Sequence, residues 1–74
     1  MNQRDAKRFA CYLAACELHA QMGSELISTR VDCESPDYDR VRSAFDEIIG
    51  ELLRRSGATF LSATPKPTDI GIAP

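Results

Sequence analysis

The sequence predicts an all-α protein: an antiparallel helical hairpin that dimerises into a four-helix bundle and carries an extended C-terminal tail. Two apolar stripes with the three- and four-residue spacing of an amphipathic helix support this fold class. The first stripe contains Phe9, Leu13, Cys16 and Ala20, and the second contains Tyr38, Val41, Phe45, Ile48 and Leu52. A chain of 74 residues buries only about 60% of its unfolded surface and is marginally stable alone. We therefore expect a homodimer that buries both stripes between its two copies.

The composition indicates a soluble cytoplasmic protein. Hydrophobic residues make up 43% of the chain and charged residues 27%, as in ordinary globular domains. No apolar run reaches the ~20 residues of a membrane span, and the charged N-terminus does not have the pattern of a signal peptide. The net charge of −2 gives no overall attraction to nucleic acid or to anionic membranes. Three cysteines, an odd number, predict free thiols in a reducing compartment.

The first helix is predicted over residues 2–22. Alanine is frequent in this segment and no proline interrupts it, so helix propensity agrees with the apolar spacing. Asn2 is the expected N-cap, with Asp5 three residues later. Gly23 has two interpretations, because it can end the helix as a C-cap or lie inside a helix that continues to Ile27.

The connecting segment, residues 24–34, allows two structures. We favour a last helical turn followed by a loop. The β-branched residues within 26–31 also permit a short strand. In that alternative, residues 26–31 and 59–61 pair as a right-handed βαβ unit around the second helix, with the first helix packed against it, and the fold is α+β.

The second helix is predicted over residues 35–56, and its boundary signals agree. Ser35 is a favourable N-cap, and Pro36 suits the first helical position. Acidic residues in the first turn and basic residues in the last turn both complement the helix dipole. Gly57 is a natural stop, so the hairpin domain spans residues 1–57.

Residues 58–74 are predicted to form an extended, partly flexible tail. Pro65, Pro67 and Gly71 prevent a long helix in this segment, and residues 59–61 supply either a short strand or an apolar anchor. Ile70 and Ile72 are the large apolar residues beyond it. We expect both to be exposed. They can serve as a short docking motif, and the alternative is that two exposed isoleucines have no functional role.

An antiparallel hairpin places the start of the first helix beside the end of the second. Five of the nine basic residues then gather at one end: Arg4, Lys7, Arg8, Arg54 and Arg55. The opposite end collects acidic residues: Glu25, Asp32, Glu34, Asp37 and Asp39. We predict that the five basic residues bind a partner, either an acidic protein or a phosphate backbone. The alternative is an ordinary solvated helix end.

The candidate metal ligands are Cys11, Cys16, His19 and Cys33. No pair of cysteines has the Cys-x-x-Cys spacing of common zinc sites, so we expect no metal. Cys11 and Cys16 are instead predicted to be small buried residues of the first helix.

No arrangement of residues points to catalysis. His19 has no neighbouring nucleophile in a recognisable triad and is expected on the surface. Asp46, Glu47 and Glu51 form an acidic face that a two-helix chain cannot shield from water. The chain also contains no glycine-rich phosphate loop. We expect no catalytic residues, no cofactor and no enzymatic activity.

Four short segments carry a resemblance to a class of known proteins. They are the basic start at residues 4–8, the alanine pair at 14–15, and the arginine-containing segments 39–42 and 51–57. In these segments the chain resembles small uncharacterised helical proteins of actinobacteria, their phages and mobile elements. The resemblance implies a helical hairpin and a phage or accessory origin, and it supplies no catalytic residues.

These features predict a small non-enzymatic interaction protein. We expect it to bind a host protein, in the role of a phage or mobile-element accessory factor. The alternative is a nucleic-acid-binding protein that uses the basic end of the hairpin. The segment between the helices is too long for a helix-turn-helix motif, which weakens that alternative.

Overall fold

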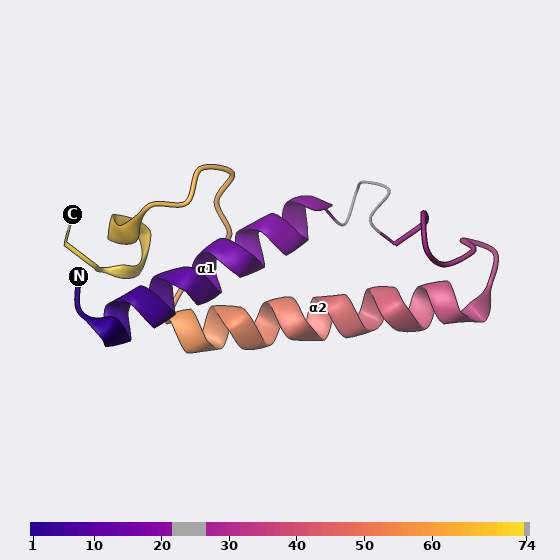
Figure 1. The fold of residues 1–74 in the computed structure, drawn as a ribbon, viewed down its shortest axis with the longest axis horizontal. Coiled ribbons are helices and arrows are strands. Elements are labelled where there is room, and N and C mark those ends of the chain that lie inside the picture. Colours follow the sequence, from indigo (N-terminus) through magenta and orange to yellow (C-terminus); the bar gives the residue numbers. More distant parts are fainter. Residues whose placement is uncertain (22–26, 74) are drawn as a thin grey trace.

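The structure is a computed structural model that describes residues 1–21 and 27–73. Two helices, α1 (Gln3–Gln21) and α2 (Pro36–Ser56), run antiparallel, and a short 3-10 helix, η1 (Pro67–Ile70), lies near the C-terminus (Figure 1). These ranges contain no strand, which confirms the all-α hairpin. The molecule is a rod of 45 × 19 × 19 Å. Neither described helix is long and apolar enough to cross a membrane.

The first helix begins as predicted, because Asn2 caps it. Its side-chain oxygen accepts a hydrogen bond from the backbone N–H of Asp5 at 2.8 Å, which satisfies one of the free donors of the first turn. The helix reaches Gln21, the last described residue before the gap. Met22 and Gly23, on which the predicted helix end depends, lie outside the described residues.

The connecting segment is a turn and not a strand wherever it is described. The carbonyl of Ile27 accepts hydrogen bonds from the N–H groups of Arg30 and Val31, at 2.9 and 2.8 Å. Such local pairing belongs to a helical turn, whereas a strand pairs with a distant segment. The βαβ alternative is therefore wrong for residues 27–31. Leu26, its first residue, lies outside the described part of the chain.

The second helix confirms its predicted boundaries. The Ser35 hydroxyl accepts a hydrogen bond from the N–H of Asp37 at 3.2 Å, and Pro36 occupies the first helical position. Gly57 ends the helix with a φ of +77°, a conformation that is strained for residues with a side chain. Its N–H donates to the carbonyls of Leu53 and Arg54, which closes the last turn.

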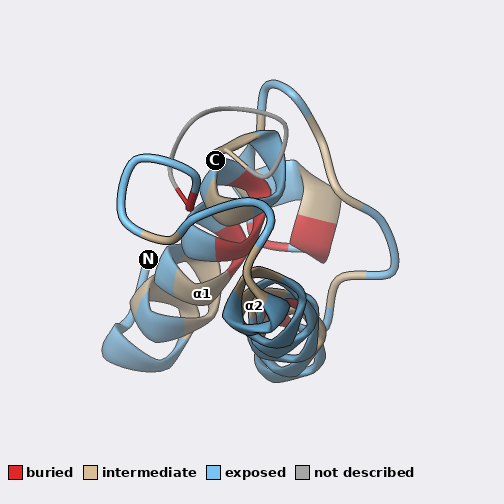
Figure 2. Ribbon diagram, turned by 90° about the vertical axis from the view of Figure 1, so that its right-hand side faces the viewer, coloured by how far each residue is buried: buried red, intermediate tan, exposed pale blue. Residues whose placement is uncertain are grey.

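The main hydrophobic cluster forms where α1 meets the C-terminal segment. Its buried members are Tyr12, Cys16, Ile70 and Ile72, and Phe9, Leu53, Ala58 and Leu61 pack against them. Figure 2 shows the buried positions gathered toward the centre, while the outer side of α2 is exposed. The core therefore includes Phe9 and Cys16 of the predicted stripe but is centred on Tyr12, so the buried face of α1 is rotated away from Leu13 and Ala20.

Several members of the predicted apolar stripes are not buried. Leu13 is 41% exposed and Ile48 is 48% exposed, while their neighbours Tyr12 and Ile49 are 0% and 5% exposed. Consecutive helical residues differ by about 100° around the axis, so each helix is rotated relative to the expected orientation. On α1 the cause is the C-terminal segment, which packs against the face that carries Tyr12. Ala20, the last member of the first stripe, is also exposed.

The expected exposure of Ile70 and Ile72 is wrong, because they are only 6% and 5% exposed. The segment after α2 turns back along α1 and brings η1 beside its N-terminal half (Figure 1). Pro67 begins η1, and Gly71 ends it with a φ of +77°. These helix-breaking residues therefore build a short turn that places both isoleucines against α1.

Polar contacts hold this C-terminal segment in place. The Tyr12 hydroxyl donates to Oδ2 of Asp69 at 3.3 Å, and the same oxygen accepts from the N–H of Lys66 at 2.9 Å. Burial raises the pKa of Tyr12 to about 12, and the negative charge of Asp69 adds to this effect. Of the two alternatives for residues 59–61, the structure has the apolar anchor and not the strand. Phe60 lies in a bend, with its ring edge-to-face against Tyr12 at a centroid distance of 6.5 Å.

Candidate functional site

An open hollow lies between the start of α1 and the end of α2, with a volume of about 990 Å³. Its lining consists of Gln3, Arg4, Lys7, Arg8, Cys11, Arg54, Arg55 and Gly57. All five basic residues singled out from the sequence are among them, and no described carboxylate lines the hollow. We call this region the basic end.

Helical spacing explains how α1 contributes to the basic end. Arg4, Lys7 and Cys11 follow each other at three- and four-residue steps, so they share one face of the helix. Arg54 and Arg55 occupy the last turn of α2, which the antiparallel arrangement brings alongside. Gly57 leaves room at the junction, because a Cβ there would lie 3.3 Å from Nη2 of Arg8.

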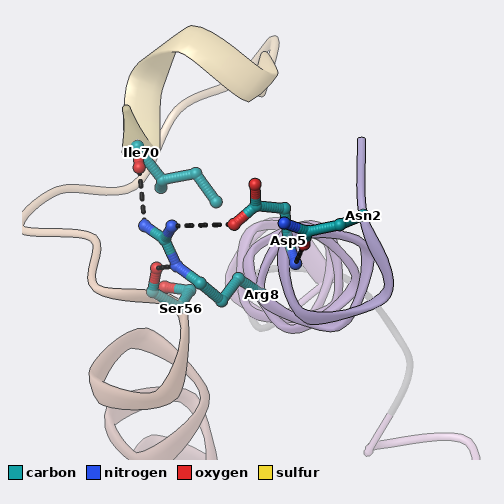
Figure 3. Close-up of polar contacts among 5 residues, drawn as sticks. All are labelled: Asn2, Asp5, Arg8, Ser56 and Ile70. Carbon is teal, nitrogen blue, oxygen red and sulfur yellow. Dashed lines mark hydrogen bonds and ion pairs between the residues drawn. The ribbon is translucent and has the colours of Figure 1, made fainter. Parts of the chain in front are cut away.

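Arg8 connects three parts of the chain, as Figure 3 shows. Its Nε donates to the Ser56 carbonyl at 3.1 Å, and its Nη2 donates to the Ile70 carbonyl at 2.6 Å. Its Nη1 forms an ion pair with Asp5 at 3.3 Å, and its side chain is 28% exposed. Arg8 therefore contributes positive charge to the basic end while three of its donors are engaged within the chain.

Arg54 and Arg55 are both paired with Glu51. Their guanidinium nitrogens lie 2.5 and 3.3 Å from the two carboxylate oxygens, and both side chains are largely exposed. The hydrogen bond and positive charge of Arg54, with a smaller contribution from Arg55, lower the pKa of Glu51. Exposed pairs of this kind are weak, so an incoming anion can compete for either arginine.

Arg4 and Lys7 are exposed, and neither has an ion pair or side-chain hydrogen bond among the described residues. The five cations of the basic end and the two carboxylates paired with them, Asp5 and Glu51, leave a formal charge of +3. The whole chain carries −2. Positive charge is therefore concentrated at one end of the rod, and Arg4 and Lys7 supply its unpaired part.

The opposite end is only weakly acidic where it is described, because its four exposed carboxylates are offset by Arg30, Arg40 and Arg42. Asp32, Glu34, Asp37 and Asp39 are all exposed there, and Arg40 pairs with Asp37 at 3.4 Å. Glu25, which the sequence also places at this end, lies outside the described residues. The molecule is therefore electrically polarised along its length.

The cysteines and the histidine do not form a common site. Cys16 is buried, Cys33 is exposed, and Cys11 is half-buried at the wall of the hollow, so its expected burial is only partial. His19 is exposed in the last turn of α1. Across residues 1–21 and 27–73, no three metal-ligating side chains lie close enough together to hold an ion.

Sequence reasoning did not include Gln3, Cys11 and Gly57 in the site. The four-residue steps from Gln3 through Lys7 to Cys11 were a usable signal for the two residues of α1. Gly57 was identified only as a helix stop, since its position opposite Arg8 depends on the packing of the helices.

Comparison with protein-family models, curated proteins and solved structures gives no match to this chain. The site is therefore interpreted from its own chemistry. Exposed guanidinium and ammonium groups around an open hollow attract carboxylate or phosphate groups.

Proposed function

We propose that this chain is a non-enzymatic binding protein that docks an acidic segment of a partner protein at its basic end. The observation that supports this is the carboxylate-free hollow, where the side chains of Arg4 and Lys7 have no partner among the described residues. Charge-assisted hydrogen bonds from these groups to carboxylates are stronger than neutral ones. Arg54 and Arg55 can add to them by releasing Glu51.

The size of the basic end favours a peptide over a nucleic acid. Duplex DNA carries one charge per ~1.7 Å, so an end 19 Å across faces about 11 phosphates. A surplus of three positive charges neutralises only a small part of that number. The acidic opposite end and the net charge of −2 would also oppose long polyanions. Three or four carboxylates on a short peptide match the available cations better.

We propose the cytoplasm as the place of action and a host protein as the partner. The three cysteines, all free thiols, are compatible with a reducing compartment. The resemblance of residues 4–8 and 51–57 to small phage and mobile-element proteins supports an accessory role.

The test is a fluorescence anisotropy titration of a labelled hexaglutamate peptide with the full chain at low salt. The double variant Arg4→Glu/Lys7→Glu should bind at least tenfold more weakly. Arg40→Glu/Arg42→Glu is a matched control, since it changes the net charge equally at the other end of the rod. It should change the affinity less than twofold. Glutamate near the N-terminus of α1 complements the helix dipole, so the test variant should keep its fold.

Equal losses in the two double variants would show that the net charge alone governs binding, and would contradict the proposed site. Absence of peptide binding by the wild-type chain would contradict the proposed ligand. Tighter binding to a 20-base-pair duplex, with an affinity that falls steeply with salt, would favour nucleic-acid binding instead.

A further inference from the structure

The apolar residues of α2 have the spacing of a coiled-coil seam. Tyr38, Val41, Phe45, Ile48 and Leu52 are separated by alternating steps of three and four residues, as are the a and d positions of a heptad repeat. We call these five residues the α2 seam. Such a narrow stripe is suited to pairing with one other helix.

The α2 seam has no complete partner within the chain. The buried residues of α2 are Ile49 and Ser56, neither of which belongs to the seam. Ile48 is 48% exposed, and the other four seam residues are half-buried. Ile48 and Ile49 differ by about 100° around the helix, whereas Phe45 lies only about 40° from Ile49, so one edge of the seam faces α1 and the edge with Ile48 faces solvent. A second helix can therefore contact the edge with Ile48 without displacing α1.

Figure 1 shows a further reason why α1 does not cover the whole α2 seam. The N-terminal part of α2 extends past the end of α1 along the long axis of the rod. The seam begins at Tyr38, in the first turn of α2. Part of its length therefore lies where α1 does not reach.

The chain exposes more surface than a compact domain of its mass. The accessible surface is 5187 Å², whereas a compact monomer of 8.2 kDa exposes about 4,500 Å². The radius of gyration is 14.0 Å, compared with about 11 Å for a compact domain of this length. The surplus of about 650 Å² is spread over the whole rod and leaves surface free for an interface, which in a standard complex buries about 800 Å² on each partner.

The charges of α2 complement those of a reversed copy. Asp37 and Asp39 lie in its first turn, and Arg54 and Arg55 lie in its last turn. An antiparallel pair of α2 helices places each acidic turn beside the basic turn of the other copy and also opposes the two helix dipoles. A parallel pair would instead place like charges together at both ends.

We propose that the α2 seam binds the α2 seam of a second copy of this chain, antiparallel, across a two-fold axis between Phe45 and Ile48. The two α2 helices form the centre of a four-helix dimer, and the two α1 helices flank them. Unlike the bundle expected from the sequence, this dimer buries only the second stripe, because the core of α1 is already occupied by the C-terminal segment. Arg4 and Lys7 remain open on α1.

The test is the molar mass of the full chain, measured by light scattering during size-exclusion chromatography over a range of concentrations. The wild-type chain should have twice the 8.2 kDa monomer mass. Ile48→Glu should raise the dimer dissociation constant at least tenfold without loss of helical circular dichroism. Leu13→Glu is the matched control, because Leu13 is a comparably exposed apolar residue on α1. It should leave the dimer intact.

A monomeric wild-type chain at all concentrations would overturn the proposal. So would dissociation by Leu13→Glu together with an unchanged mass for Ile48→Glu. If Ile48→Glu does not fold, Ala44→Glu provides a second test, since Ala44 is exposed beside the seam and glutamate is a good helix former. It should also weaken the dimer, and an unchanged mass would count against the seam.

A charge exchange tests the antiparallel orientation. Asp37→Arg should weaken the dimer, and adding Arg55→Asp should restore it, because the two positions face each other across the antiparallel pair. Failure of the second substitution to restore the dimer would contradict this orientation. Ile48→Glu separates the partner's acidic turn from Arg54 and Arg55 and leaves Arg4 and Lys7 in place, so the monomer should still bind hexaglutamate. This proposal and the proposed function therefore fail independently.

Discussion

Replacement of Arg8 by methionine should destabilise the fold strongly, because Arg8 joins α1 to the end of α2 and to the C-terminal segment. Methionine keeps most of the aliphatic stem and removes the hydrogen bonds to the Ser56 and Ile70 carbonyls. Hydrogen bonds from a charged group contribute about 1.5–3 kcal/mol each. Because the side chain is 28% exposed, the lower value applies to both, which gives a loss of about 3 kcal/mol.

That loss is large for a chain of this size, since 74 residues correspond to a total stability of about 4–11 kcal/mol. The melting temperature should fall by more than about 10 °C. The assay is thermal and urea unfolding followed by circular dichroism, at one fixed protein concentration so that any dimerisation is held constant. Arg55→Met is the control, because its surface ion pair with Glu51 contributes less than about 1 kcal/mol. A loss no greater for Arg8→Met than for Arg55→Met would refute the structural role given to Arg8.

Two further predictions concern the hydrophobic cluster. Ile70→Ala should lower the free energy of unfolding by about 2–3 kcal/mol in urea titrations, because Ile70 is buried. Leu13→Ala should lower it by less than about 1 kcal/mol, because Leu13 is exposed. A larger loss for Leu13→Ala than for Ile70→Ala would mean that the C-terminal segment does not cover α1. The raised pKa of Tyr12 means that folding favours its neutral form, so the associated stability is complete below pH 10 and is lost as the pH rises toward 12. The test measures absorbance at 295 nm and circular dichroism against pH for the wild-type chain and for Tyr12→Phe. The loss of folding stability at alkaline pH should occur only in the wild-type chain. Ionisation of Tyr12 near pH 10 in an intact fold would contradict the prediction.

The elements that the sequence predicted well are those determined by local interactions. Asn2, Ser35 and Gly57 act on backbone groups within a few residues of themselves, so caps and stops are visible in the sequence. The same holds for the grouping of basic residues, which needs only two helix boundaries and an antiparallel connection.

The features that were missed depend on contacts between distant parts of the chain. The hydrogen bond from Arg8 to the Ile70 carbonyl joins residues 62 positions apart. No local pattern around Pro67 or Gly71 indicates that their turn places two isoleucines against α1. Once that segment packs there, it determines which face of α1 is buried, and Leu13 becomes exposed. The engagement of Arg8 within the chain could not be predicted for the same reason.

The most direct test of the central claim, that the basic end binds an acidic segment, is a nuclear magnetic resonance titration of the ¹⁵N-labelled chain with hexaglutamate. We expect the amide signals of residues 3–11 and 54–57 to shift together and to saturate, while those of residues 13–20 in the second half of α1 remain in place. Shifts of residues 13–20 as large as those at the basic end, or no shifts at all, would contradict the account.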